Sequence, residues 1–388
     1  MTTQSYWINN SYKLTQIGEF KMGGKLQLFV PINAQLIINE PQQVKYGSFG
    51  NARTVETVEA EFYLKSAREV LNENLLFERQ IRASLHKNVV LGYVQRLVKG
   101  KAKDGINAHS VNMAIRKQLS TIPNLNFETD IRNECFVTVN DAGNFDFTYY
   151  DKEINFKKMW NCLCSHSSPR NSQELLPLFL CNETFKNEWE IFLSTHSNET
   201  ETLLSEKRLF NIPSRSFSVA GEIQFGNWGL IYKDMFRLLS AVNKGANLDL
   251  YVYIVATDTL NSLISDQTVE YRKALKEFKT HTLNGNIPSN IWIIPVDIKI
   301  SEEALNEACS EYINIINYIE NEKKKIKRQK SQIDILYLQI KQNSTSSEIK
   351  ILKEKFKKNK AKHMKTKADL YEYIRQHSIL DDNDEDSE

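Results

Sequence analysis

The stretch VAGEIQFGNWGLIYKDMFRLL, from Val219 to Leu239, has the pattern of a short strand that leads into a helix. Its strand part is apolar except for Glu222 and Gln224, which are two positions apart. Since side chains alternate along a strand, these two polar groups share one face, and Ile223 and Phe225 share the other. A buried carboxylate is costly to ionise unless a cation compensates its charge. The pattern therefore predicts that Glu222 and Gln224 face a cleft or a metal ion.

The segments around this stretch predict an α/β fold, with a mixed central sheet flanked by helices. Helices are expected after Asn227 and over Thr268–Phe278. Apolar and polar residues alternate on both sides of NDAGN, which predicts a β-hairpin over Glu134–Asp151. Further strands are expected at Leu203–Ile212, Phe217–Phe225, Leu248–Thr257 and Ile291–Ile298.

Four parts are expected along the chain. Residues 1–150 have the pattern of an α+β region, and residues 151–302 that of the α/β core. Residues 303–380 are expected to form a basic helical arm, and residues 381–388 an acidic disordered tail. Within the arm, Ile319, Ile326, Ile333 and Ile340 recur every seven residues, which is typical of a coiled coil.

The composition limits the classes of protein that fit. The 388 residues carry a formal net charge of +2, so the chain as a whole is not a basic polymer. Five cysteines do not suggest a disulfide framework, which favours the reducing cytoplasm. The first residues lack the pattern of a signal peptide, and runs such as LYVYIVA are far too short to span a bilayer. We therefore expect a cytoplasmic protein with no membrane partner.

The run Glu222, Gln224, Phe225 and Gly226, followed by a helix, resembles the E-x-Q motif of type II restriction endonucleases of the BglII and BstYI kind, in the PD-(D/E)XK superfamily. The resemblance covers about residues 200–300. It implies a restriction-endonuclease-like core and Mg²⁺-dependent, site-specific hydrolysis of double-stranded DNA. In that family the glutamate binds Mg²⁺ and the glutamine lies beside the attacking water. The resemblance assigns these two roles to Glu222 and Gln224.

The resemblance also implies a second acid, at the end of the preceding strand. No aspartate lies between Asp151 and Asp234. A turn at PSRS, residues 213–216, would bring residues 205–207 opposite residues 222–224. Glu206 is therefore the expected second metal-binding and catalytic carboxylate.

The resemblance has further implications for partners. A palindromic DNA site invites a two-fold dimer, so a homodimer is expected. A DNA methyltransferase that protects host DNA is implied in the cell. Residues 1–150 are the candidate DNA-recognition part, and the lysine-rich arm is a candidate contact with the DNA backbone. Alternatively, the lysines of the arm only solvate a coiled coil.

Other interpretations of the same residues remain open at this stage. Glu222 is alternatively an edge-strand acid paired with Arg215 or Lys233, and Gln224 a solvent-facing strand residue. Lys233 itself either reaches a phosphate or is a solvated helix lysine. The chain as a whole is alternatively a non-catalytic DNA-binding or scaffold protein with a coiled-coil arm, or a repair nuclease.

Two further motifs fit either a functional site or an ordinary structural role. NAHSVNMAIRKQL predicts a helix with Asn112, Arg116 and Lys117 facing outward, as in a helix-turn-helix motif or in a plain amphipathic helix. The cysteines and histidine of NCLCSH, with a later cysteine, are either zinc ligands or core thiols beside a surface histidine. These residues are Cys162, Cys164, His166 and Cys181.

Overall fold

The computed structural model of the chain divides into two compact units. The core unit comprises Gln35–Val89 and Ala108–Lys299, and the arm unit comprises Met1–Ala34, Val90–Asn107 and Ile300–Glu388. Residues 343–380 of the predicted helical arm, and the predicted acidic tail, from 381 to 388, lie outside the described residues. The structure describes residues 18–22, 25–38, 63–98, 101–132, 134–138, 144–164, 176–177, 179–213, 216–264, 268–285, 287 and 289–342.

The core unit is built on a mixed sheet in which the strand order is β11-β10-β9-β8-β6-β7. Strand β10 runs parallel to both β9 and β11, whereas β8 runs antiparallel to β9, and β6 antiparallel to β8 and β7. The outer side of β11 pairs with β3 (Tyr63–Leu64) and with the end of β2 (Lys25–Ile38). The other strands are β6 (Leu125–Arg132), β7 (Cys135–Thr138), β8 (Phe145–Tyr149), β9 (Val219–Gln224), β10 (Leu250–Ala256) and β11 (Ile291–Lys299).

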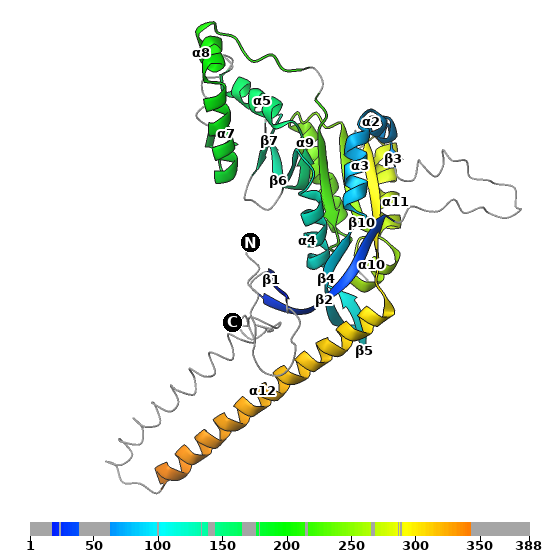
Figure 1. Cartoon of the computed structure of the whole chain (residues 1–388), viewed down its shortest axis with the longest axis vertical. Helices are drawn as coiled ribbons and strands as arrows, with labels where there is room; N and C mark the ends of the chain where they lie inside the picture. The colour runs from blue at the N-terminus through cyan, green and yellow to red at the C-terminus, as the bar shows by residue number, and fades with distance from the viewer. Residues whose placement is uncertain are drawn as a thin grey trace, which may run out of the picture. The chain divides into compact units, whose positions relative to one another are not determined.

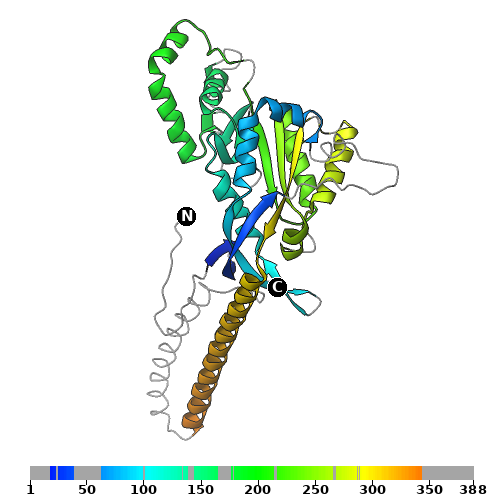
Figure 2. The same ribbon diagram turned by 45° about the vertical axis from the view of Figure 1, so that its right-hand side comes forward.

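Helices flank this sheet, so the predicted fold class is confirmed (Figures 1 and 2). Every residue of β10 is buried, as expected for a continuous apolar run at the centre of a parallel segment. Helices α9 (Leu230–Asn243) and α11 (Tyr271–Leu283) pack on the sheet through a shared apolar cluster, which includes Met235, Tyr253 and Phe278. The remaining helices of this part are α2 (Ala67–Glu73), α3 (Leu75–Ser84), α4 (Ala108–Leu119) and α10 (Asp258–Ile264).

A helical insertion separates strands β8 and β9. Its helices are α5 (Lys152–Cys164), α7 (Glu183–Thr195) and α8 (Ser197–Ser205). They enclose an aromatic cluster of their own, in which Trp160, Trp189 and Phe210 are buried. The strand predicted over Leu203–Ile212 is therefore wrong, because its first residues belong to α8.

The predicted hairpin over Glu134–Asp151 is also wrong. Strands β7 and β8 do form on either side of NDAGN, but each pairs with β6 instead of with the other. The apolar alternation identified the two strands correctly. Their pairing depends on β6, which the local sequence of a hairpin does not include.

The arm unit contains the β1–β2 hairpin, the β4–β5 hairpin and the long helix α12. Strand β1 (Gly18–Met22) pairs with the start of β2, and β4 (Asn88–Val98) pairs antiparallel with β5 (Lys101–Ile106). The buried Tyr93 of β4 donates a hydrogen bond to Asp104 of β5, at 2.5 Å, and its ring meets Tyr312 of α12 edge-on.

Helix α12 runs without interruption over Glu302–Gln342, which confirms a long helix (Figure 1). The coiled coil stays a prediction, because side chains of its proposed seam lie outside the described ones. Every helix in the described ranges is too short or too polar to cross a membrane.

Candidate active site

Strand β9 carries Glu222 into the interior of the core unit. Because β9 has β8 on one side and β10 on the other, the edge-strand interpretation of Glu222 is wrong. The residue is only 3% exposed, and its carboxylate forms an ion pair with Arg237 of α9. Lys233, on the same helix, is exposed. The buried carboxylate of Glu222 therefore pairs with a guanidinium that follows it by 15 residues in the sequence.

Gln224 faces the same helix as Glu222, so the predicted shared face is confirmed. Its Nε2 donates to Oδ2 of Asp234 on α9, at 2.8 Å, and its Oε1 accepts from the backbone N–H of Gly226, at 2.8 Å. The Tyr253 hydroxyl, on β10, donates to the same Asp234 oxygen at 3.2 Å. Because a carboxylate only accepts and a backbone N–H only donates, these contacts fix the orientation of the carboxamide. The solvent-facing interpretation of Gln224 is therefore wrong.

Asp146, on β8, is an acid beside Glu222 that the sequence interpretation missed. Its Oδ2 accepts a hydrogen bond from the backbone N–H of Ile223, at 2.7 Å, and its Oδ1 forms an ion pair with Arg116 of α4. Its negative charge contributes to raising the pKa of Glu222. The signal in the sequence was a carboxylate between Phe145 and Phe147, in a strand of otherwise buried character.

Glu206 lies in a different place from the one predicted. It is the C-terminal cap of α8, its side chain is 47% exposed, and its carboxylate pairs with Arg208 at 2.8 Å. The hairpin that would have brought it opposite Glu222 does not form, because β9 pairs with β8 and β10. The structure therefore brings Asp146 to Glu222, instead of Glu206.

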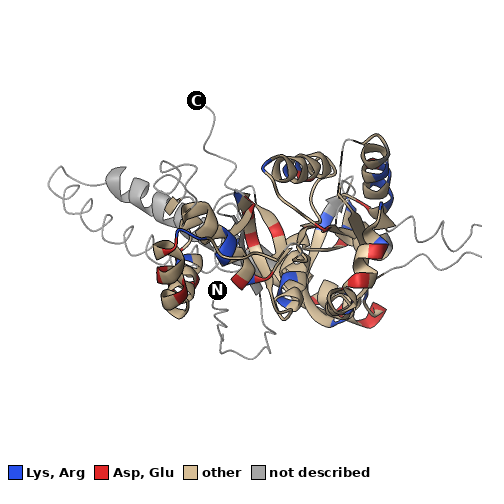
Figure 3. Cartoon of the chain, turned by 90° about the horizontal axis from the view of Figure 1, so that it is seen from above, with Lys and Arg blue, Asp and Glu red and all other residues tan. Residues whose placement is uncertain are grey.

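The electrostatics of the site favour a cation. Burial raises the pKa of the Glu222 carboxyl well above its usual value, and the charges of Asp146 and Asp234 raise it further, while Arg237 lowers it. Burial also raises the pKa of Asp234, against the effect of its hydrogen bond from Gln224. Acidic residues lie within strands of the sheet as well as on the surrounding helices (Figure 3). Negative groups held together in this way gain stability from positive charge close by.

The donors near Glu222 are oxygens, which suit a hard metal ion. In the part of the chain that the structure describes, no three side chains of the His, Cys, Asp and Glu types are grouped so as to hold a metal ion. Mg²⁺, however, usually binds one or two carboxylates and keeps several water molecules. Asp146 and Glu222 provide two carboxylates, so the residues present fit a magnesium ion.

The helix-turn-helix interpretation of α4 is wrong. The element before α4 is strand β5, and not a helix. The side chain of Asn112 donates to the backbone carbonyl of Ile223, at 3.3 Å, and Arg116 pairs with Asp146 and Glu128. Two of the three polar residues therefore face the candidate active site or its border, and not outward.

The cysteines of the candidate zinc motif contact groups outside that motif. The thiol of Cys162 contacts the thiol of the buried Cys135. Cys181 is exposed, with its sulfur 3.9 Å from the carbonyl oxygen of Thr138, and His166 lies outside the described residues. This leaves Cys162 and Cys181 with separate partners.

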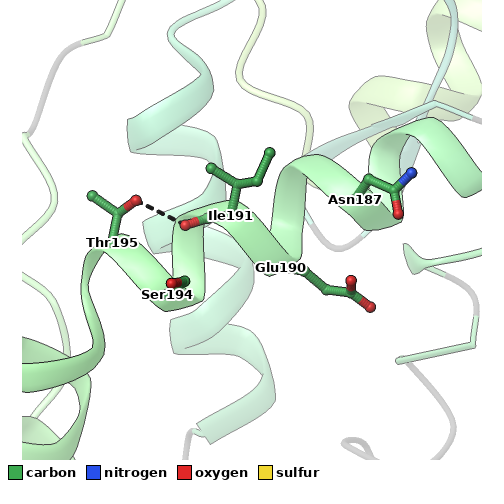
Figure 4. Close-up of a pocket in the computed structure, with 5 residues that line it drawn as sticks. All are labelled: Asn187, Glu190, Ile191, Ser194 and Thr195. Atoms are coloured by element: carbon green, nitrogen blue, oxygen red, sulfur yellow. Dashed lines mark hydrogen bonds between the residues drawn. The ribbon is translucent and has the colours of Figure 1, made fainter.

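A shallow pocket lies along helix α7, and none of the residues of the candidate active site lines it (Figure 4). It follows one face of the helix, where Thr195 donates to the carbonyl of Ile191 at 2.8 Å. The residues that line it are Asn187, Glu190, Ile191, Ser194 and Thr195. No charged pair or buried acid of this group suggests catalysis.

A comparison with family models adds an independent finding. Residues 103–295 match the family described as restriction endonuclease BglII/BglIII. The match includes β8, β9, α9 and β10, and therefore Asp146, Glu222 and Gln224. A comparison with curated proteins gives no match.

Proposed function

Since the chain belongs to the restriction endonuclease BglII/BglIII family, we propose that Asp146, Glu222 and Gln224 are the catalytic residues of this enzyme. The protein is a site-specific type II restriction endonuclease, and its substrate is double-stranded DNA. The observation that carries the assignment is the contact between β8, which carries Asp146, and β9, which carries Glu222. Asp146 accepts a hydrogen bond from the backbone of Ile223, the residue directly after Glu222.

We propose Mg²⁺ as the cofactor, held by the carboxylates of Asp146 and Glu222. The support is the donor chemistry: two carboxylates from neighbouring strands, one of them buried. When bound, such an ion lowers the pKa of a water molecule and compensates negative charge on the phosphoryl oxygens. The chain's own contribution is to place the two carboxylates on neighbouring strands, with Asp146 fixed by the backbone of β9.

Gln224 is proposed to position the attacking water. A carboxamide has two N–H groups and an oxygen with two lone pairs. One N–H is used by Asp234 and one lone pair by the backbone of Gly226. The remaining N–H and lone pair have the chemistry to hold a water molecule, on a side chain whose orientation is already fixed. Because the orientation of the Gln224 side chain is already fixed, less entropy is lost when the water is placed for attack.

Plasmid cleavage with purified variants tests the assignment. Asp146→Asn and Glu222→Gln are each expected to lower the cleavage rate by about 10³-fold or more, because each removes a charge on which the metal and the transition state depend. Glu206→Gln, at an exposed ion pair, is the matched control and is expected to cleave at the wild-type rate. Loss of cleavage in Glu206→Gln, or normal cleavage in Asp146→Asn, would show that the centre is assigned wrongly.

A homodimer is proposed as the active form. The support is a group of exposed aromatic side chains on α9 and in the turn that leads into it: Trp228, two residues before the helix begins, and Tyr232 and Phe236 on the helix are 50%, 43% and 74% exposed. Contiguous exposed apolar side chains of this kind are typical of interaction sites. The spacing of four residues places them on one face of a helix, and a two-fold axis would bring that face against its copy.

The remaining proposals concern the cell. An enzyme that cuts specific sites would also cut the DNA of its host, so we propose that a DNA methyltransferase of the same specificity protects that DNA. The cytoplasm is the proposed location, because restriction enzymes are generally cytoplasmic. The assignment of residues 1–150 to recognition, and of the basic arm to backbone contacts, stays a prediction that truncated variants would test.

A further inference from the structure

The carboxylate of Glu222 is already paired with a positive charge from the protein. Arg237 forms this ion pair with its Nη1, and the same atom lies 3.8 Å from Oδ1 of Asp234, one turn earlier on α9. The side chains of Glu222 and Arg237 are 4% and 16% exposed, so the pair is largely shielded from water. Arg237 thus contacts two carboxylates, only one of which is a proposed metal ligand.

Asp146 has the same kind of arrangement, from a different helix. Arg116 of α4 pairs with Asp146 through Nη2 and with Glu128 of β6 through Nη1. The side chain of Arg116 is 20% exposed, and that of Glu128 is 49% exposed. Each proposed metal ligand is therefore held by an arginine that also has a second carboxylate within reach.

The charges of this group match one divalent cation. It contains four carboxylates and two guanidiniums, which leaves a formal charge of −2. Arginine keeps its charge at all physiological pH values, so the two positive charges are permanent. A divalent ion beside the two metal-binding carboxylates would bring the group to neutrality without any change in the arginines.

We propose that Arg116 and Arg237 are counter-ions that hold Asp146 and Glu222 in the metal-free enzyme and release them when a divalent metal ion binds. In the metal-bound state the two guanidiniums stay paired through Glu128 and Asp234. The inference rests on the proposed function, because it takes Asp146 and Glu222 as the metal ligands. It adds two positioning residues that control access of the metal to those ligands.

In this arrangement Arg237 and the metal ion compete for the carboxylate of Glu222. In the metal-free state Glu222 is paired and not left as a buried charge, which is otherwise costly. Metal binding must break that pair, so Arg237 lowers the affinity for the metal. A merely structural arginine would have the opposite effect, because its removal would let Glu222 move away from the ligand position.

The test is a titration of Mn²⁺ into the metal-free full-length protein without DNA, followed by electron paramagnetic resonance of the unbound ion. Arg237→Gln is expected to bind Mn²⁺ about five- to fiftyfold more tightly than the wild type, the usual range of coupling between two linked binding events. Its metal-free form is expected to melt at a lower temperature. Arg208→Gln, which removes the exposed partner of Glu206, is the control and is expected to match the wild type.

A second variant keeps the inference testable if Arg237→Gln fails to fold. Glu128→Gln removes a partly exposed carboxylate, so the fold should tolerate it. Arg116 then has Asp146 as its main carboxylate partner and releases it less readily. Mn²⁺ affinity is expected to fall about two- to fivefold, in line with the strength of exposed ion pairs.

The results separate this inference from the proposed function. If Glu222→Gln binds Mn²⁺ as tightly as the wild type, the metal site itself is assigned wrongly. If Glu222→Gln loses affinity but Arg237→Gln does not gain any, only the counter-ion role is refuted. Unchanged or tighter binding by Glu128→Gln would also contradict that role.

Discussion

Replacing Gly221 with alanine is expected to disturb the sheet beside the catalytic acids. Gly221 of β9 lies opposite Phe147 of β8 in the strand register. A Cβ at position 221 would lie 2.2 Å from Cζ of the Phe147 ring, and 2.6 and 2.7 Å from its two Cε atoms. Carbon atoms pack best at about 3.5–4.0 Å. The ring is fully buried, so it has no solvent-filled space into which it can turn.

The size of the effect follows from that geometry. Overpacking of a core costs about 1–3 kcal/mol, occasionally more. Three ring atoms conflict with the new methyl group, so we expect about 3 kcal/mol. In an unfolding unit of about 150–250 residues, the size class of the core unit, each kcal/mol lowers the melting temperature by roughly 2–4 °C, which gives a fall of about 6–12 °C. Strand β9 also carries Glu222, and a displacement near 1 Å in such a site costs about 10²-fold in rate.

Differential scanning calorimetry and plasmid cleavage at 25 °C measure the two effects. Gly229→Ala is the matched control, because a Cβ there would only meet Asn227 Oδ1 at 3.9 Å. The double variant Gly221→Ala with Phe147→Leu should regain part of the lost stability, since leucine lacks the conflicting ring atoms. If Gly221→Ala melts and cleaves like Gly229→Ala, the pairing of β8 with β9 described here is wrong.

Four further predictions concern the site, the dimer, the arm unit and the pH dependence. Gln224→Ala should keep Mn²⁺ affinity within about twofold but lower single-turnover cleavage by about 10²-fold or more, as expected for loss of a group that orients the water; weaker metal binding would contradict that role. Phe236→Glu should convert a dimer to a monomer in sedimentation equilibrium, and a monomeric wild type would refute the proposed interface. Tyr93→Phe should lower the unfolding free energy in urea by about 1–3 kcal/mol, because Asp104 loses a buried hydrogen-bond donor; an unchanged value would show that the bond is not formed. Because the pKa of Glu222 is raised in the folded protein, its contribution to the free energy of unfolding is full below about pH 4.3 and is lost as the pH rises through the folded-state pKa. Urea unfolding of the metal-free protein should show this decline in the free energy of unfolding, and Glu222→Gln should make the decline smaller.

The strands and helices near β9 were predictable because each has a strong local pattern. The run that became β10 is apolar throughout, and the residues of α9 that pack on the sheet recur every three or four positions. Alternation along β9 placed Glu222 and Gln224 on one face, which the structure confirms. These features depend on residues close together in the sequence, so no knowledge of the tertiary structure was needed.

The second acid was not predictable by the same reasoning. The prediction of Glu206 assumes that the strand before β9 in the sequence is also its neighbour in space, and it therefore considers only residues after Asp151. The helical insertion breaks that assumption, because β8 and its Asp146 precede the insertion. Apolar residues from 203 to 212 fit a strand or a helix, and the packing of α8 on the aromatic cluster decided the outcome.

The contacts of α9 with β9 were also beyond the sequence. The spacing of Asp234 and Arg237 shows that they share a helix face. It does not show which strand residues that face meets, because this depends on how the helix packs on the sheet. The alternative interpretation of Glu222 as a paired acid named Arg215 or Lys233 as the partner, and the structure gives Arg237.

The position of a bound metal ion tests the assignment of Asp146 and Glu222 as metal ligands. Crystals of the enzyme soaked in Mn²⁺ should give an anomalous-difference peak within about 2.0–2.5 Å of carboxylate oxygens from both Asp146 and Glu222. A peak at Glu206, or one that contacts neither Asp146 nor Glu222, would show that the metal ligands are assigned wrongly.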